Sequence, residues 1–160
     1  QMLMKRMMIF IKIGLVCCLL VFIGLMMRSD PQSDKTVLEV EESIAAVADM
    51  SSMERAQEND IRRAFGLSVN DYEGVVYYKS VSNMDVDEIL IVKLKSSEQA
   101  EAVEGAVNSR IDSQLQSFQG YGVEQCQLLD EAIVDVHGNF VFYVVSQYAS
   151  AYDKAFLSSL

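Results

Sequence analysis

Few side chains in this sequence are of the types that commonly perform catalysis, and they stand far apart. His137 is the only histidine, and it lies in the stretch V-H-G-N, where glycine and asparagine are typical of a turn. Cys126 is the only cysteine outside an apolar N-terminal stretch, so an intramolecular disulfide in the rest of the chain is excluded. Turn histidines are ordinarily solvated, and isolated cysteines ordinarily pack as small apolar residues. We therefore predict no catalytic residue and no cofactor.

One short stretch carries the oxygen ligands that hard cations prefer. The candidate ligands are Asn83, Asp85, Asp87 and Glu88. An EF-hand loop would need glycine at the sixth position and glutamate at the twelfth, and these positions hold Glu88 and Leu94. A solvated hairpin loop is the preferred interpretation, and a calcium-responsive module stays open as an alternative.

The acidic residues leave a second kind of chemistry open. Glycoside hydrolysis needs only two suitably spaced carboxyl groups, and the 23 acidic residues of this chain offer many pairs. No G-x-S-x-G, H-E-x-x-H, G-x-x-x-x-G-K or G-x-G-x-x-G motif occurs. A small cell-wall enzyme that uses carboxylates therefore remains an alternative to a protein without catalytic activity.

The N-terminal part of the chain has the composition of a membrane anchor. Met7–Met27 contains 21 residues with one charge, Lys12, and about 20 apolar residues suffice to cross a bilayer as a helix. Basic residues before this segment favour a cytoplasmic N-terminus. The stretch GLMMRSDPQ that follows lacks the paired small residues of a signal-peptide cleavage site. We predict a cytoplasmic tip and transmembrane anchor over 1–28, with residues 7–27 in the lipid bilayer.

The remainder of the chain is strongly acidic. Residues 29–160 hold nine basic and 23 acidic residues, which is a net charge of −14. Such a surface repels nucleic acid and anionic lipid headgroups, so nucleic acid is excluded as a partner. We predict a polar linker over 29–35 and an extracytoplasmic domain over 36–160, located outside the cell membrane.

Hydrophobic periodicity predicts four helical regions in this domain. Apolar residues recur every three or four positions in each of them, and capping boxes at Thr36 with Glu39 and at Ser96 with Gln99 mark two of their beginnings. The predicted helices are Thr36–Met50, Met53–Phe65, Ser97–Gln119 and Ala149–Leu160, with a short helical or irregular patch at EQCQLLDEA.

Four strands are predicted between these helices. Glu73–Ser80 and Glu88–Lys95 form one pair, and two more strands flank His137, Gly138 and Asn139 in a hairpin. The last strand is apolar on both faces, which predicts a central position. The fold class is therefore α+β, with the order ααββαββα and a mostly antiparallel four-stranded sheet packed on the long helix.

Three stretches carry a family resemblance: DIRRAFGLSVNDYEGVVYYKS, DEILIVKLKSSEQAEAVEGAVNSRIDSQLQSF and YGVEQCQLLDEAIVDVHGNFVFYVVS. They resemble the bacterial family named domain of unknown function 4358, over about Ile44 to Phe156. The resemblance implies a small envelope protein of Gram-positive bacteria with an N-terminal anchor or lipoprotein signal. It carries over no active-site residue. The sequence thus favours a non-catalytic, single-pass membrane protein that binds an envelope protein or a cell-wall component.

Overall fold

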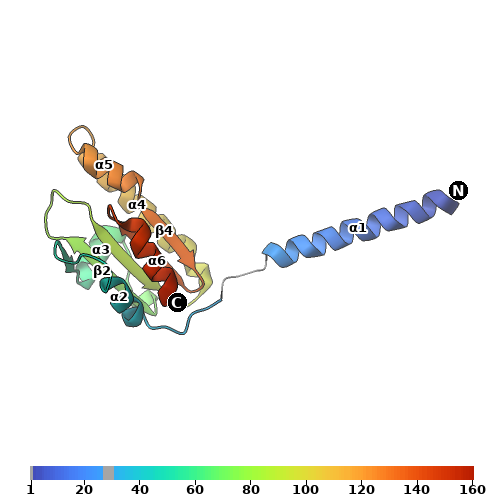
Figure 1. Cartoon of the computed structure of the whole chain (residues 1–160), viewed down its shortest axis with the longest axis horizontal. Helices are drawn as coiled ribbons and strands as arrows, with labels where there is room; N and C mark the ends of the chain where they lie inside the picture. Colours follow the sequence, from blue (N-terminus) through green and yellow to red (C-terminus); the bar gives the residue numbers. More distant parts are fainter. Residues whose placement is uncertain (1, 27–30) are drawn as a thin grey trace. The chain divides into compact units, whose positions relative to one another are not determined.

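The computed structural model describes residues 2–26 and 31–160, and the chain divides into two compact units, Gln1–Pro31 and Gln32–Leu160. The first unit contains one helix, α1 (Met2–Met26), in which Met4–Gly24 is long and apolar enough to cross a membrane (Figure 1). The end of the predicted anchor, residues 27 and 28, and the start of the predicted linker, residues 29 and 30, lie outside the described residues. From Gln32 onward the predicted linker belongs to the second unit, within which Ser33 N–H donates to Asn139 Oδ1 at 2.9 Å.

The second unit is built on an antiparallel sheet of five strands. These are β1 (Met53–Arg55), β2 (Gly74–Ser80), β3 (Glu88–Lys93), β4 (Ile133–His137) and β5 (Phe140–Val145), in the spatial order β1-β2-β3-β5-β4. The predicted α+β class is confirmed, as are the interior position of β5 and the hairpin at Gly138, whose φ is +59°.

The prediction of four strands is wrong by one, because the predicted helix Met53–Phe65 includes the residues that form β1. The three residues of β1 pair with the end of β2, so that Met53 lies opposite Ser80. The helix α3 (Glu58–Phe65) begins only after this strand, and it ends at Gly66, whose φ of +69° suits the predicted helix stop. A three-residue strand has no periodicity of its own, since pairing across the sheet alone defines it.

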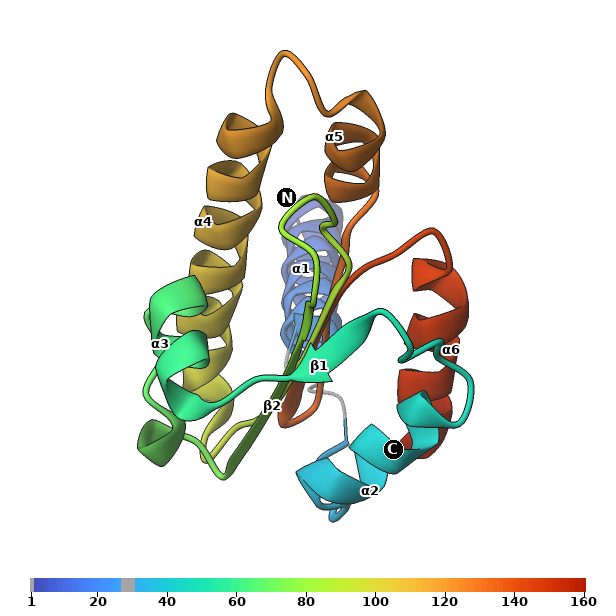
Figure 2. The ribbon, with the colours of Figure 1, turned by 90° about the vertical axis from the view of Figure 1, so that its left-hand side faces the viewer.

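Two layers of helices cover the sheet (Figure 2). On one face, α2 (Val37–Ala45) and α6 (Ala149–Ser159) pack on side chains such as Ile91 and Phe142. On the other face, α3, α4 (Ala100–Phe118) and α5 (Val123–Asp130) pack around Leu90 and Val92. Two 3-10 turns, η1 (Val69–Asp71) and η2 (Ser97–Gln99), precede β2 and α4. Both predicted capping boxes are present.

The strand β3 is buried along its whole length, on both faces. The alternation of lysines with apolar residues in Glu88–Lys95 predicts one partly solvated face, and this prediction is wrong for Lys93, which is only 7% exposed. Its ammonium forms an ion pair of 3.0 Å with Glu73 and lies 5.9 Å from the centre of the Phe140 ring. A sheet covered by helices on both faces leaves no solvated side for a central strand.

Candidate functional site

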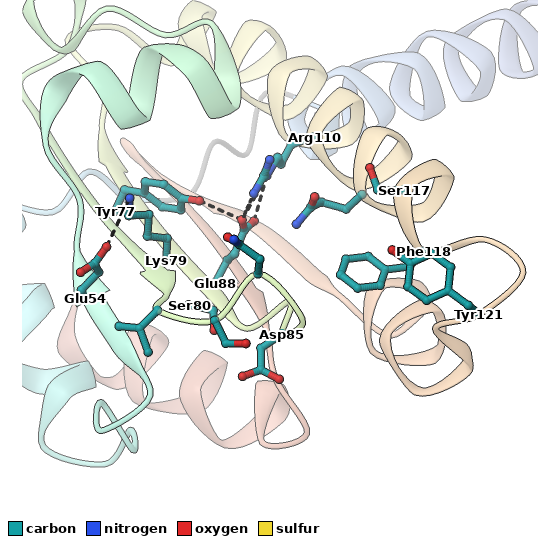
Figure 3. A pocket seen from close by; sticks show the side chains of 14 residues that line it. Glu54, Tyr77, Lys79, Ser80, Asp85, Glu88, Arg110, Ser117, Phe118 and Tyr121 are labelled. Atoms are coloured by element: carbon teal, nitrogen blue, oxygen red, sulfur yellow. Dashed lines mark hydrogen bonds and ion pairs between the residues drawn. The ribbon is translucent and has the colours of Figure 1, made fainter.

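A polar cleft opens between the β2–β3 loop and the second half of α4 (Figure 3). Its volume of about 440 Å³ falls within the range of roughly 300–1,000 Å³ that is usual for ligand pockets. The lining residues come from the strands β1–β3, the loop between β2 and β3, the helix α4 and the turn that follows it: Glu54, Tyr77, Lys79, Ser80, Val81, Ser82, Asn83, Asp85, Glu88, Arg110, Gln114, Ser117, Phe118 and Tyr121.

Strand register places a carboxylate at the floor of this cleft. Tyr77, Leu90 and Tyr143 lie side by side on β2, β3 and β5. Glu88 precedes Leu90 by two residues, so its side chain points to the same face of the sheet, between the two tyrosines. Its side chain is only 3% exposed. An acidic residue in such a place needs hydrogen-bond donors around it.

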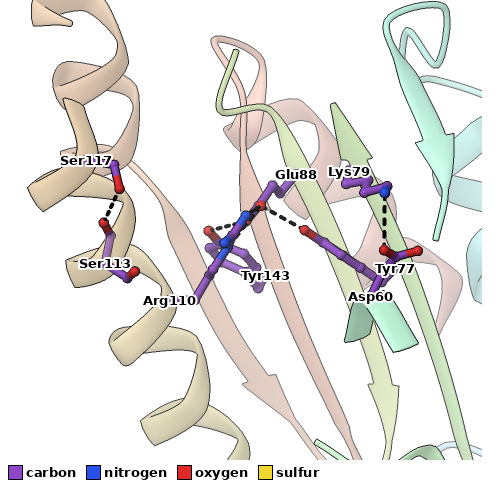
Figure 4. A network of polar contacts seen from close by, with 8 residues as sticks. All are labelled: Asp60, Tyr77, Lys79, Glu88, Arg110, Ser113, Ser117 and Tyr143. Atoms are coloured by element: carbon purple, nitrogen blue, oxygen red, sulfur yellow. Dashed lines mark hydrogen bonds and ion pairs between the residues drawn. The ribbon is translucent and has the colours of Figure 1, made fainter. Parts of the chain in front are cut away.

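Three side chains supply these donors (Figure 4). The hydroxyls of Tyr77 and Tyr143 donate to the two carboxylate oxygens of Glu88 at 2.8 and 3.1 Å. Arg110 reaches over from α4 and donates to Oε1 through Nη2 and through Nε at 3.0 Å, and Nε also lies 3.3 Å from Oε2. Both oxygens of Glu88 are therefore engaged by donors, and the charged guanidinium makes these bonds stronger than neutral ones.

The charge state of this network follows from burial and from the charges within it. Burial, and then the charge of Glu88, raises the pKa of Tyr77 and Tyr143 well above the usual value, so both phenols keep their protons. Burial alone would lower the pKa of Arg110, but hydrogen bonding and attraction to Glu88 raise it overall. The ring of Phe65 meets both tyrosine rings edge-on, at 5.0 and 6.0 Å, and so fixes their positions.

One line of residues on α4 forms both the core contact of the helix and the wall of the cleft. Val103 and Val107 are fully buried against the sheet. The same line continues through Arg110, Gln114 and Ser117 at steps of three, four and three, and these residues line the cleft. Ile111 and Leu115, which continue the apolar periodicity of the helix, are half-buried and pack against the same core. The change from apolar to polar residues along this line was the available signal for the site.

The opposite wall is the β2–β3 loop, and α5 holds it in place. Gln125 Nε2 donates to the backbone carbonyl of Met84 at 2.9 Å. At the strand end of the cleft, Lys79 forms ion pairs of 3.3 Å with Glu54 and Asp60. The cationic side chains of the lining are therefore matched by acidic neighbours.

The structure does not bring the four candidate metal ligands to one point. Asn83, Asp85 and Glu88 line the polar cleft, whereas Asp87 lines a separate depression beside α5. The oxygens of Glu88 are already occupied, and burial, with a smaller effect of Asp85, raises the pKa of Asp87. Within residues 2–26 and 31–160, no group of three or more His, Cys, Asp or Glu side chains is arranged to hold a metal ion.

The remaining candidates lie away from the cleft. His137 ends β4, and Cys126 is half-buried on α5 against the core. Asp135 and Asp153 form a carboxyl pair between β4 and α6, where burial and then the charge of Asp135 raise the pKa of Asp153 to about 6. Sequence reasoning missed this pair because its members are 18 positions apart and nothing in their local patterns distinguishes them.

Residues 46–146 match the family model described as a domain of unknown function (DUF4358). The chain belongs to this family. The match confirms the resemblance seen in the sequence, and it includes β1 to β5 and the whole polar cleft. Neither the curated proteins nor the solved structures contain a significant match to the chain.

The boundaries of the DUF4358 match have a structural consequence. The helices α2 and α6 lie outside residues 46–146, yet together they cover one face of the sheet. Phe156 of α6 is fully buried and stacks on Phe142 with ring centres 4.8 Å apart. The folded domain of this chain therefore extends beyond the matched residues on both sides.

Proposed function

We propose that this chain is a single-pass membrane protein whose acidic domain lies outside the cell membrane and binds another component of the bacterial envelope without catalysing a reaction. The binding site in this proposal is the polar cleft. The proposed orientation, with a cytoplasmic N-terminus, rests on the apolar helix α1 and on the basic residues Lys5, Arg6 and Lys12 at its beginning.

The observation that carries the non-catalytic role is the closed hydrogen-bond network at the floor of the cleft. A general base needs a free lone pair and a general acid needs a proton to release. The two oxygens of Glu88 already accept bonds from Tyr77, Tyr143 and Arg110. Because the raised pKa values keep both phenols and the guanidinium protonated, the floor of the cleft provides rigid recognition groups instead of reactive ones.

A specific observation favours a second candidate function, an enzyme that uses carboxylates. Burial, and then the charge of Asp135, raises the pKa of Asp153 to about 6, a direction of shift that is common in carboxyl groups that act as general acids. Neither residue lines the polar cleft. The pair lies between a strand and the helix that covers it, so we assign it to the pH dependence of the domain's stability.

The test uses the full chain in lipid nanodiscs, incubated with soluble fragments of bacterial envelope. Components that co-elute with the chain are identified by mass spectrometry. The proposal expects the wild-type chain to retain a component whose mass is unchanged. A Gln114→Trp variant, whose indole fills the cleft, should no longer retain it, whereas a Gln116→Trp variant should. Gln116 is exposed and lies on α4 outside the cleft, so it is the matched control.

Three outcomes would contradict the proposal. Equal retention by the two variants would exclude the cleft as the binding site. If the wild-type chain changes the mass of the component and the Asp153→Asn variant does not, the carboxylate enzyme would be established instead. Retention of no component at all would exclude a binding role. The orientation is tested separately, because protease added to intact cells should digest the domain and spare an N-terminal tag.

A further inference from the structure

We infer that the polar cleft binds a short, uncharged saccharide; this inference rests on the proposed binding function and names the chemical class of the ligand. The charges of the lining give the first argument. Two cationic side chains, Lys79 and Arg110, face three anionic ones, Glu54, Asp85 and Glu88. Lys79 and Arg110 are both held in ion pairs with acidic neighbours.

Charged ligands gain little from such a cleft. The attraction of Arg110 for an anion is largely cancelled by Glu88, which it contacts directly. The net charge of −14 over residues 29–160 repels anions before they arrive. A cation finds the carboxylates of Glu54 and Glu88 already paired with Lys79 and Arg110. The electrostatics therefore match a neutral ligand.

The hydrogen-bonding groups of the cleft suit hydroxyls. The bonds to Glu88 use Nε and Nη2 of Arg110, which leaves the two N–H donors of Nη1 outside that ion pair. The arginine side chain is 22% exposed. The amides of Asn83 and Gln114 can each donate and accept. The Ser82 hydroxyl already accepts from Met84 N–H at 3.1 Å and keeps its own donor, whereas the Ser117 hydroxyl donates to the Ser113 carbonyl at 3.0 Å and keeps its lone pairs. A sugar hydroxyl both donates and accepts, so it can satisfy such groups whichever way they are turned.

Aromatic rings stand at one end of this polar lining. Tyr121 is 64% exposed, and its ring centre lies 5.7 Å from that of Phe118 (Figure 3). The face of an aromatic ring carries negative charge density and attracts the weakly positive C–H groups of a sugar ring. Neutral hydrogen-bonding groups beside an open aromatic face are the combination that a pyranose ring requires.

An extended peptide fits this cleft less well. Peptides commonly bind by adding a strand to an open sheet edge, where backbone groups provide the affinity. At the floor of the cleft the strand backbones are already paired, because β3 lies between β2 and β5, and the end of β2 lies between β1 and β3. Only β1, which contributes Glu54, stands at the edge of the sheet, and it is three residues long. Recognition in the cleft therefore falls to side chains, as it does for a saccharide.

The experiment is calorimetric titration of the full chain in lipid nanodiscs, which avoids detergents that carry sugar headgroups. The probes are two uncharged oligosaccharides, the tetramers of N-acetylglucosamine and of glucose, and one anionic oligosaccharide, the tetramer of galacturonic acid. We expect at least one uncharged tetramer to bind and the anionic tetramer not to bind. Gln114→Ala and Tyr121→Ala should each weaken binding about fivefold, the effect of losing one ordinary contact, whereas Gln116→Ala should not.

Three results would overturn the inference: no binding of either uncharged tetramer at millimolar concentration, tighter binding of the anionic tetramer, or equal affinity in the cleft and control variants. If the uncharged tetramers fail while Gln114→Trp still loses an envelope component, the saccharide inference falls and the binding function stands. If Gln114→Trp loses nothing either, both fall.

Discussion

The buried pair of Glu88 and Arg110 predicts a sign reversal in a double-mutant cycle. The Glu88 side chain is 3% exposed and that of Arg110 is 22% exposed. Replacing Arg110 by Met leaves a carboxylate in the interior with only two phenolic donors. Breaking a buried pair in this way costs about 3–5 kcal/mol of unfolding free energy, because the remaining charge is uncompensated.

The second substitution should have opposite effects in the two backgrounds. In the wild-type chain, Glu88→Gln removes the charge partner of Arg110 and should cost about 2 kcal/mol. In the Arg110→Met background, the same change removes the stranded charge and keeps an oxygen that can accept from Tyr77 or Tyr143. Glu88→Gln should then restore about 1–2 kcal/mol of unfolding free energy, so the effects of the two substitutions should be strongly non-additive.

The assay is urea unfolding of the full chain in nanodiscs, followed by far-ultraviolet circular dichroism, with α1 contributing a constant baseline. Arg62→Met is the control, because its ion pair with Glu58 joins side chains that are 59% and 45% exposed. An exposed pair of this kind contributes at most about 1 kcal/mol. Effects of Arg110→Met and Glu88→Gln that add within about 0.5 kcal/mol would refute the reasoning, since independent sites behave in that way.

Three further predictions concern the packing of the domain. Gly74→Ala should destabilise the domain by about 1–3 kcal/mol, because the added Cβ would lie 2.5 Å from Val37 Cγ1. The control Gly105→Ala meets no atom within 4 Å and should stabilise α4 by up to about 1 kcal/mol. Urea unfolding compares the two variants, and equal changes in unfolding free energy would contradict the packing of α2 on β2. The raised pKa of Asp153 means that its contribution to stability is complete at low pH and is lost as the pH rises through about 6. Asp153→Asn should therefore raise Tm by about 3 °C near pH 7.5 and hardly at all near pH 4, allowing for solvent screening, and the same shift at both pH values would exclude this cause. Deleting α6 with residues 147–160 should abolish cooperative thermal unfolding, because it bares an apolar sheet face, and a sharp transition in the shortened chain would contradict this.

Local signals in the sequence were sufficient for most of the elements. The capping boxes at Thr36 and Ser96 and the hairpin at Gly138 depend on residues within a few positions of one another, and all three are present. The strand β1 could not be predicted in this way, since its three residues are defined by their pairing with Tyr78 to Ser80.

The candidate site could be predicted only in fragments. Glu88 stood out in the sequence, but as a possible metal ligand in a loop. Its real environment depends on strand register, which brings Tyr77 and Tyr143 to its sides, and on the rotation of α4, which turns Arg110 toward it. These residues are 11, 55 and 22 positions away from Glu88. No local pattern connects them, so the network emerges only from the assembled sheet and helix.

The most direct test of the central claim is hydrogen-exchange mass spectrometry of the full chain with and without the retained envelope component. Binding in the polar cleft predicts slower exchange in residues 80–88 and 110–121, which form its two walls. Protection confined to β4 and α6, or no protection anywhere in the domain, would contradict the account.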